Sequence, residues 1–282
     1  MQRYINLISY FGGKYPQLKW LLSKFPSGKY HFIDIMCGSA NVALNVNYPL
    51  VTINDVNEEV VNLFRVLRND YDEFLRILYF TPFSRAEHER IVTDNINGLQ
   101  FDDVERARRF FVRSQIGFGA NGSQNNHYGC GFEWVIHKTN YYRVDNWNVK
   151  LKRLAKITAR LRNFQIENKD AMLLFDQVNK PGNIVYFDPP YIMGVRKSKK
   201  RYKHEVEHSF HYQIAEKMRT AECLVAVSGY DSELYDEIFS DFYKTVNIPQ
   251  SANTGKVLKV DALWTNYNTE TVSGSYKMKF EH

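Results

Sequence analysis

Asp188, Pro189, Pro190 and Tyr191 are the residues of this sequence whose types and spacing most directly suggest chemistry. The two prolines fix the backbone φ angle near about −65° and carry no N–H group, so the carbonyl oxygens around Pro189 join no local helix. The Asp188 carboxylate and the Pro189 carbonyl then form a rigid pair of acceptors beside the Tyr191 ring. Two acceptors and an aromatic face suit a planar substrate that carries an amino group. A tight turn after a strand is the alternative, because Asp and Pro are both common in turns.

The apolar run before Asp188 predicts a buried strand, and similar runs recur along the chain. Strands are expected at residues 31–36, 50–54, 164–167, 183–187, 223–228 and 242–248, and helices at 41–47, 58–68, 171–178 and 209–220. A strand, a glycine-containing turn, a helix and a second strand that ends in Asp55 follow the βαβ order of a parallel nucleotide-binding sheet. Asn57 is expected to cap the helix that follows. Such sheets bind ligands at the carboxyl ends of their strands, where Asp188 would lie.

Between residues 71 and 162 the pattern changes to mostly helical segments around a stretch rich in glycine and asparagine, residues 117–131. We therefore predict an α/β sheet that is interrupted by a helical insertion. The insertion is also basic: residues 101–165 contain twelve Lys or Arg and five acids, whereas the whole chain has a net charge of +6. This concentration favours a surface that meets a polyanion such as nucleic acid, with solvated helix faces as the alternative. Within residues 150–162 the apolar residues are spaced to face a core.

No apolar run reaches the roughly 20 residues that cross a bilayer, and the first residues lack the apolar stretch of a signal peptide. The three cysteines, Cys37, Cys130 and Cys223, lie far apart and form no C-x-x-C pair. Their spacing argues against a zinc site or a disulfide framework. We expect a cytoplasmic protein without a metal.

The sequence resembles the Dam-type (D12 class) DNA adenine-N6 methyltransferases, whose catalytic motif is D-P-P-Y. Similar motifs occur in order along nearly the whole chain: Tyr10-Phe11-Gly12-Gly13-Lys14, residues 32–42, Asn54-Asp55, Asn168-Lys169-Asp170, and residues 202–205, 227–235 and 262–267. Cofactor motifs first, a long insertion next and the catalytic motif last is the arrangement of the family's alpha group. The resemblance implies an α/β, Rossmann-like methyltransferase sheet with an inserted, mainly helical target-recognition domain. The expected boundaries are residues 1–57 and 164–282 for the catalytic, S-adenosylmethionine-binding domain and 58–163 for the DNA-binding domain.

The resemblance also implies a site for S-adenosylmethionine. Its expected residues are Tyr10, Gly12, Gly13, Lys14, Asp34, Gly38, Asp55, Asp170 and Asp188. Asp55 follows Asp34 by 21 positions, close to the roughly 20-residue spacing at which an acid meets ribose hydroxyls; helix capping is the alternative. The glycines of the first motif would allow close backbone approach, and the Lys14 ammonium would lie near the cofactor carboxylate, unless this motif is only a turn. Ala40 replaces the second glycine of the usual G-x-G loop and adds one methyl group there.

The insertion and the loop after the catalytic motif are expected to contact DNA. The expected DNA-binding residues are Arg113, Asn121, Ser123, Asn125, Asn126, His127, Arg196 and Lys197. The basic run 196–203 suits a lid that contacts phosphates near the target base, with a solvated surface loop as the alternative. Residues 119–127 do not reproduce the hairpin of members that recognise GATC, so the recognition sequence stays open.

The residues and the resemblance together predict a site-specific enzyme that rotates an adenine out of duplex DNA and transfers a methyl group from S-adenosylmethionine to its N6 atom. Asp188 and the Pro189 carbonyl would accept the two amino hydrogens and Tyr191 would stack on the base, with no need for a metal or a covalent nucleophile. An RNA adenine methyltransferase and a DNA-binding protein of the same fold without catalysis are the alternatives. A protein-amide methyltransferase would explain the positive charge poorly. Double-stranded DNA is the expected partner and would associate the protein with the nucleoid. A cognate restriction endonuclease is compatible with this role.

Overall fold

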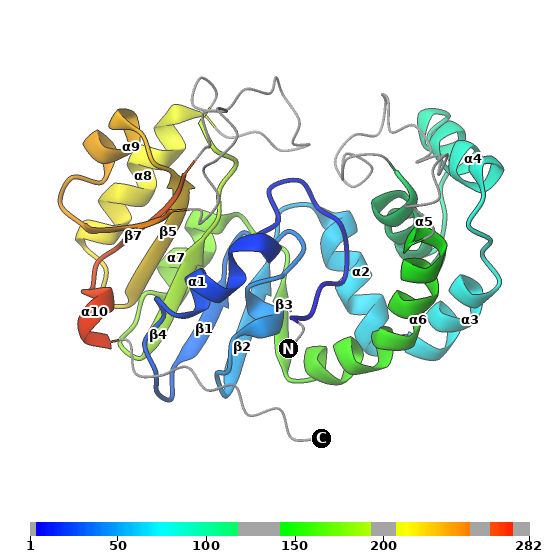
Figure 1. Cartoon of the computed structure of the whole chain (residues 1–282), viewed down its shortest axis with the longest axis horizontal. Coiled ribbons are helices and arrows are strands. Elements are labelled where there is room, and N and C mark those ends of the chain that lie inside the picture. The colour runs from blue at the N-terminus through cyan, green and yellow to red at the C-terminus, as the bar shows by residue number, and fades with distance from the viewer. Residues whose placement is uncertain (1–3, 118–141, 193–206, 249–259, 273–282) are drawn as a thin grey trace.

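The computed structural model describes residues 4–117, 142–192, 207–248 and 260–272, which form a seven-stranded sheet flanked by helices (Figure 1). The strands are β1 (His31–Asp34), β2 (Leu50–Asn54), β3 (Phe164–Glu167), β4 (Asn183–Phe187), β5 (Leu224–Tyr230), β6 (Tyr243–Asn247) and β7 (Asp261–Thr265). Their order across the sheet is β3-β2-β1-β4-β5-β7-β6. Strands β1 to β5 pair in parallel, whereas β7 pairs antiparallel with both β5 and β6. This sheet confirms the expected Rossmann-like fold class.

The strand order reverses direction between β1 and β4, which are neighbours in the sheet. From β1 the chain adds strands outward through β2 to β3, and from β4 it adds them in the other direction through β5. In register, Asp34 at the end of β1 lies between Ile53 of β2 and Tyr186 of β4. The loops that leave β1 and β4 therefore diverge at this point, which is where open α/β sheets form a ligand crevice.

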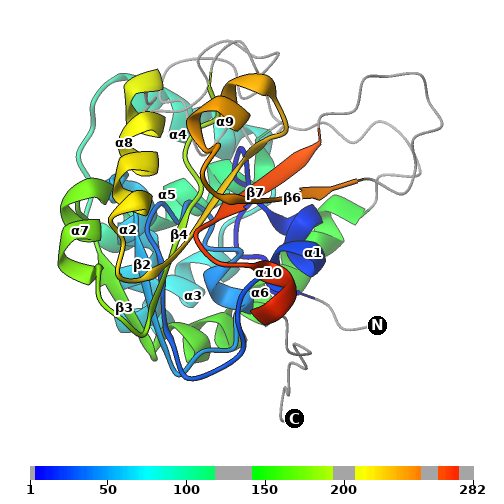
Figure 2. The same ribbon diagram turned by 90° about the vertical axis from the view of Figure 1, so that its left-hand side faces the viewer.

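Successive residues of the central strands face opposite sides of the sheet, and each side has its own core. On one side, Phe32 and Tyr186 belong to a buried cluster with α1 (Leu18–Leu22) and α2 (Glu58–Asn69). On the other side, Ile33 and Val185 belong to a second cluster with α7 (Ala171–Val178), α8 (His208–Arg219) and α9 (Glu233–Ile238). Figure 2 shows α7 and α8 on one face of the strands and α1 on the other.

The helical region extends the first cluster beyond the β3 edge of the sheet (Figure 1). It contains α3 (Tyr71–Tyr79), α4 (Arg85–Ile96), α5 (Asp103–Ile116) and α6 (Tyr142–Leu161). Asn57 caps α2 by accepting a hydrogen bond from the backbone N–H of Glu59, as the sequence predicts. In α6, the apolar residues expected to face a core are buried: Leu151, Leu154, Ile157 and Leu161. The same buried cluster continues from the sheet into α2, α5 and α6, so the core is continuous across residue 58. A domain boundary at that residue stays a prediction.

The structure differs from the expected secondary structure at residues 41–47 and in elements that were not expected, among them β7 and α9. The helix expected at residues 41–47 is wrong in extent, since only a 3-10 turn, η2 (Ala43–Asn45), forms there. Strand β7 was not expected, and it completes the sheet by pairing between β5 and β6. The remaining short elements are η1 (Tyr15–Gln17) and α10 (Thr269–Val272). Within the described ranges, no helix is both long and apolar enough to cross a membrane.

Candidate active site

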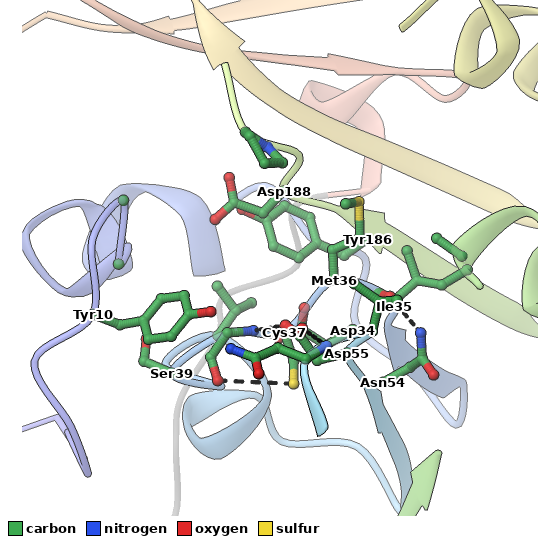
Figure 3. Close-up of a pocket in the computed structure, with 18 of the residues that line it drawn as sticks. Tyr10, Asp34, Ile35, Met36, Cys37, Ser39, Asn54, Asp55, Tyr186 and Asp188 are labelled. Carbon is green, nitrogen blue, oxygen red and sulfur yellow. Dashed lines mark hydrogen bonds between the residues drawn. The ribbon is translucent and has the colours of Figure 1, made fainter. Parts of the chain in front are cut away.

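A pocket of about 950 Å³, partly open to solvent, lies at the carboxyl ends of β1, β2 and β4. All nine residues predicted to bind the cofactor line it: Tyr10, Gly12, Gly13, Lys14, Asp34, Gly38, Asp55, Asp170 and Asp188. Figure 3 shows the Tyr10 hydroxyl and the Asp188 carboxylate turned into this space from opposite sides. The fold thus brings five motifs that are separate in the sequence to one cavity at the switch point of the sheet.

Close backbone approach around Tyr10 shapes one wall of this pocket. Gly12 has φ of +77° and Gly38 has φ of +47°, both in the left-handed region that favours glycine. A Cβ atom at Gly38 would lie 2.8 Å from the Tyr10 ring, and one at Gly13 would lie 3.1 Å from the Tyr10 carbonyl oxygen. Ala40 also adopts a positive φ, +51°, which an alanine tolerates at some cost. The loop after β1 therefore keeps the shape of a glycine turn although one glycine is replaced.

Two carboxylates line the pocket, the buried Asp34 and the half-buried Asp55. Asp34 accepts one long hydrogen bond from the backbone N–H of Ala43, at 3.4 Å, while its Oδ1 atom has no hydrogen-bond partner among the described residues. Burial raises the pKa of Asp34 well above its ordinary value, and the negative charge of Asp188 adds to this effect. Asp55 accepts hydrogen bonds from the backbone N–H groups of Gly38 and Asn57, and burial raises its pKa as well. Both acids are placed to receive a donor or a positive charge from a ligand.

Asn54 links three segments around the pocket by hydrogen bonds. The sequence had indicated only its neighbour, Asp55, as a site residue. Its side-chain amide donates hydrogen bonds to the carbonyls of Ile35 and Lys169, at 2.9 and 3.0 Å, and its Oδ1 accepts one from the Lys169 N–H at 2.8 Å. One buried side chain thus joins the ends of β1 and β2 to the turn before α7. Asp170 in that turn caps α7 by accepting from the N–H groups of Met172 and Leu173.

The D-P-P-Y segment leaves β4 at the rim of the pocket. Asp188 forms an ion pair with Lys14, with Nζ and Oδ1 2.5 Å apart. Burial raises the pKa of Asp188, and the Lys14 charge partly offsets that rise. The Tyr191 ring packs edge-to-face against Tyr230 at the end of β5, with the ring centres 4.4 Å apart. Next in the chain, Ile192 donates its backbone N–H to the hydroxyl of Tyr235 on α9. The segment is therefore fixed at both ends.

The sequence missed two groups of residues at this site. Met36, Cys37, Ser39, Asn41, Tyr186 and Phe210 also line the pocket. Phe210 comes from α8, which the sequence predicts as a helix without indicating that Phe210 reaches the pocket. Tyr230 and Tyr235 were within motifs that the resemblance indicated, but only packing shows that they support the Tyr191 loop.

The predicted DNA-binding residues are mostly untested. Asn121, Ser123, Asn125, Asn126, His127, Arg196 and Lys197 lie outside the described residues. For Arg113 the structure contradicts an exposed phosphate contact: its side chain is buried, and its guanidinium lies 6.0 Å from the centre of the Phe110 ring.

The positive charge counted in the insertion is also partly internal. Arg108 and Arg109 on α5 are buried and pair with acids outside the counted region: Arg108 lies 2.6 Å from Glu87, and Arg109 lies 2.9 Å from Asp94. Both also pair with Glu105 of their own helix, at 2.6 Å. The interpretation of this whole segment as a polyanion-binding surface, and the alternative of solvated helix faces, are therefore both wrong for α5. These arginines tie α5 to α4.

A parallel sheet with a glycine-shaped pocket at its switch point is the arrangement of enzymes that bind a nucleotide-like cofactor. The acceptor-rich segment at the rim of this pocket gives the site the character of an amino-group methyltransferase. The chain belongs to the D12 class N6 adenine-specific DNA methyltransferases, since the sequence model of that family matches residues 10–253. It is therefore an enzyme that methylates adenine in DNA and needs a methyl donor.

Individual relatives agree with this family. The chain is 25% identical to the type II methyltransferase M1.LlaDCHI of Lactococcus lactis subsp. cremoris, a match that covers 91% of this chain and 93% of the relative. It is 24% identical to the DNA adenine methylase of Salmonella typhi, over 95% of this chain and 96% of that protein. A DNA N-6-adenine-methyltransferase of Escherichia phage P1 is 22% identical over 66% of this chain, but the match spans only 24% of the phage protein.

Proposed function

We propose that this enzyme transfers a methyl group from S-adenosylmethionine to the N6 atom of an adenine that is rotated out of duplex DNA. The observation that carries the proposal is the position of Asp188, whose carboxylate faces the pocket (Figure 3). The Tyr191 ring lies near it, since Lys14 Nζ contacts both Asp188 and this ring. A catalytic carboxylate beside an aromatic face, at the rim of a cofactor-sized pocket, can receive a single unstacked base. A base within the duplex could not reach it.

The residues of the pocket fit S-adenosylmethionine. The unpartnered Oδ1 atom of buried Asp34 calls for a donor or cation, which the amino group of this cofactor would provide. Asp55 suits the ribose hydroxyls, and Asp170 lies where the adenine end is expected. The Tyr10 ring packs so closely on Gly38 that a side chain there would displace it from the pocket wall. When bound, the cofactor supplies an electrophilic methyl group on a sulfonium sulfur.

The protein's part in the reaction is to orient the adenine amino group. The Asp188 carboxylate and the Pro189 carbonyl accept the two N6 hydrogens, which favours a tetrahedral nitrogen with its lone pair available for attack. Pro189 and Pro190 are buried and hold these acceptors rigidly. The raised pKa of Asp188 also makes its carboxylate a better acceptor for the proton that N6 must lose. The Tyr191 ring, held by Tyr230, provides the stacking surface.

The proposal is tested with labelled S-adenosylmethionine, duplex DNA that contains adenine, and nucleoside analysis of the product. We expect labelled N6-methyladenine from the native chain. Asp188→Ala and the isosteric Asp188→Asn should bind the cofactor normally but lose about 10²–10³-fold in turnover, since they lose the charged acceptor. Asp241→Asn is the matched control, because Asp241 is an exposed acid that pairs with Arg219. Near-native turnover by Asp188→Ala would refute the role of Asp188.

The same assay separates the alternatives. Structured RNA is offered as a second acceptor, and transfer to RNA but not to duplex DNA would replace the proposed substrate. Mapping the modified adenines gives the recognition sequence. The predicted catalytic and target-recognition domains, a role in the cytoplasm near the nucleoid and a partner endonuclease remain proposals that follow from this function.

A further inference from the structure

Lys14 is buried where the N-terminal glycine motif, predicted to bind the cofactor, meets the D-P-P-Y segment, predicted to be catalytic. It ends the N-terminal glycine motif, yet its ammonium contacts the catalytic segment: Nζ lies 2.5 Å from Asp188 Oδ1 and 4.7 Å from the centre of the Tyr191 ring. The same Nζ donates a hydrogen bond to the Gly12 carbonyl at 3.1 Å. The side chain is 7% exposed, so these contacts replace most of the water around the ammonium. The sequence predicted that Lys14 would lie near the carboxylate of the cofactor, whereas in this structure its ammonium pairs with Asp188.

The Gly12 contact explains why the ammonium points toward the catalytic carboxylate. Gly12 has a positive φ, and Gly13 leaves no room for a side chain against the Tyr10 carbonyl, so this loop has one tight shape. Its Gly12 carbonyl turns toward the ammonium and takes one of its three hydrogens. The Asp188 carboxylate takes another. In the part of the chain that the structure describes, Lys14 is the only residue that forms an ion pair or hydrogen bond with the Asp188 side chain.

We propose that Lys14 is a positioning residue for the methyl transfer: it binds Oδ1 of Asp188, keeps that carboxylate ionised, and leaves Oδ2 to accept a hydrogen from adenine N6. The proposal rests on the function proposed above for Asp188. It reassigns Lys14 from the cofactor to the catalytic acid.

The surroundings of Asp188 show why it needs a cation. Its pKa is raised by burial and by the charge of Asp261 on β7, and Lys14 opposes both effects. Asp34 of β1 also interacts repulsively with Asp188, and the Tyr186 hydroxyl on β4 is a neighbouring titratable group. Without Lys14, these groups would raise the Asp188 pKa further. A protonated Asp188 is neutral and loses most of its ability to attract the N6 hydrogens.

The sign of the pH effect follows from this arrangement. Asp188 is active as a carboxylate, so activity falls as the pH drops through its pKa. Removing the Lys14 charge raises that pKa and moves the acidic limb of the rate profile to higher pH. A residue that only stabilises the fold, or only binds the cofactor carboxylate, would not move this limb.

The experiment compares Lys14→Met and Lys14→Arg in two measurements: the Kd for S-adenosylmethionine without DNA, and the single-turnover methylation rate as a function of pH. For Lys14→Met we expect a Kd within about twofold of native, a rate at pH 7 lowered by roughly 10²-fold, and partial recovery at alkaline pH. Lys14→Arg keeps the charge and should retain the native acidic limb. Lys217→Met is the matched control, since Lys217 pairs with Asp176, an exposed acid of α7, and does not line the pocket.

The outcomes separate the three roles of Lys14. A Kd weakened by more than about tenfold with an unmoved acidic limb would return Lys14 to the cofactor and overturn the proposal. A loss of rate at every pH without a shifted limb would also overturn it. If Lys14→Met does not fold, as judged by thermal unfolding, Lys14→Gln serves for the same measurements.

Asp188→Asn distinguishes failure of this proposal from failure of the proposed function. In that background the further change Lys14→Met should have little additional effect, because the two residues act as a unit. A fully active Asp188→Asn would refute the catalytic role proposed for Asp188, independently of the result for the Lys14 variants.

Discussion

Gly229 offers a sharp test of how the fold supports the catalytic segment. It lies in β5, where it pairs with Ala262 of β7. A Cβ at Gly229 would lie 2.9 Å from Cζ3 of Trp264 and 3.0 Å from Cε1 of Tyr235, closer than real Cβ contacts occur. The Tyr235 ring cannot move away freely, because it stacks on Trp264 and Phe239 with ring centres 5.3 and 6.1 Å away.

Whether Gly229→Ala raises or lowers the free energy of unfolding depends on this crowding. In a strand with room for a methyl group, the change would stabilise the fold by about 0.4–1 kcal/mol, because it restricts the unfolded chain. Forcing a methyl group into a packed core instead costs about 1–3 kcal/mol. We therefore expect a net loss of roughly 1–2 kcal/mol in the free energy of unfolding.

The same change should lower activity. Tyr235 accepts the Ile192 N–H and lies 6.5 Å, between ring centres, from Tyr191. A displaced Tyr235 therefore shifts the catalytic segment, and a misplacement of about 1 Å can cost about 10²-fold in rate. The assays are urea unfolding and single-turnover methylation.

A second substitution checks the cause. Trp264→Phe removes the ring atom nearest to the new methyl group, so Gly229→Ala should cost less in that background, with a coupling of about 1 kcal/mol. If Gly229→Ala stabilises the protein or leaves its rate unchanged, the crowding argument is refuted.

Two further predictions concern buried charge. Arg108→Met should lower the free energy of unfolding by about 2–3 kcal/mol, as measured by urea unfolding. This is less than the usual loss of about 3–5 kcal/mol for a broken buried ion pair, because Glu87 and Glu105 each keep another arginine partner. A loss under about 0.5 kcal/mol would contradict the prediction. Burial lowers the pKa of His211 to about 4, so the unfolded chain binds a proton below pH 6.5 that the folded chain refuses, and stability falls as the pH drops from there. His211→Phe should therefore reduce the loss of stability between pH 7 and pH 4.5 by about 2.5 kcal/mol, as measured by urea unfolding at the two pH values.

Local patterns predicted most of the sheet. The runs at residues 164–167 and 183–187 match β3 and β4. Strand β4 is a nearly continuous apolar segment because it is buried inside the sheet, whereas β3 alternates apolar and polar residues at the sheet edge. Strand β7 was missed, since its place depends on antiparallel pairing with two other strands rather than on a signal of its own. The turn at residues 41–47 was predicted as a helix because only tertiary packing limits it to three residues.

The charge of the insertion shows where composition misleads. A count over residues 101–165 includes Arg108 but not Glu87, which folding brings to 2.6 Å. Ion pairs form between helices that are distant in the sequence, so a local window counts the cation and omits its partner. Arg113, which the sequence expected to bind DNA, is likewise buried, and no local pattern indicated this.

The sequence by itself determined the family, the fold class, and which motifs line the pocket, since strand patterns and turn residues are local properties and the D-P-P-Y motif is specific. Only the tertiary structure decided which of these residues meet. The ion pair of Lys14 with Asp188 joins an N-terminal loop to a segment beyond the insertion. Its formation depends on the divergence of loops between β1 and β4 and on the burial of Lys14 against the D-P-P-Y segment, and neither condition is present in any short stretch of the chain.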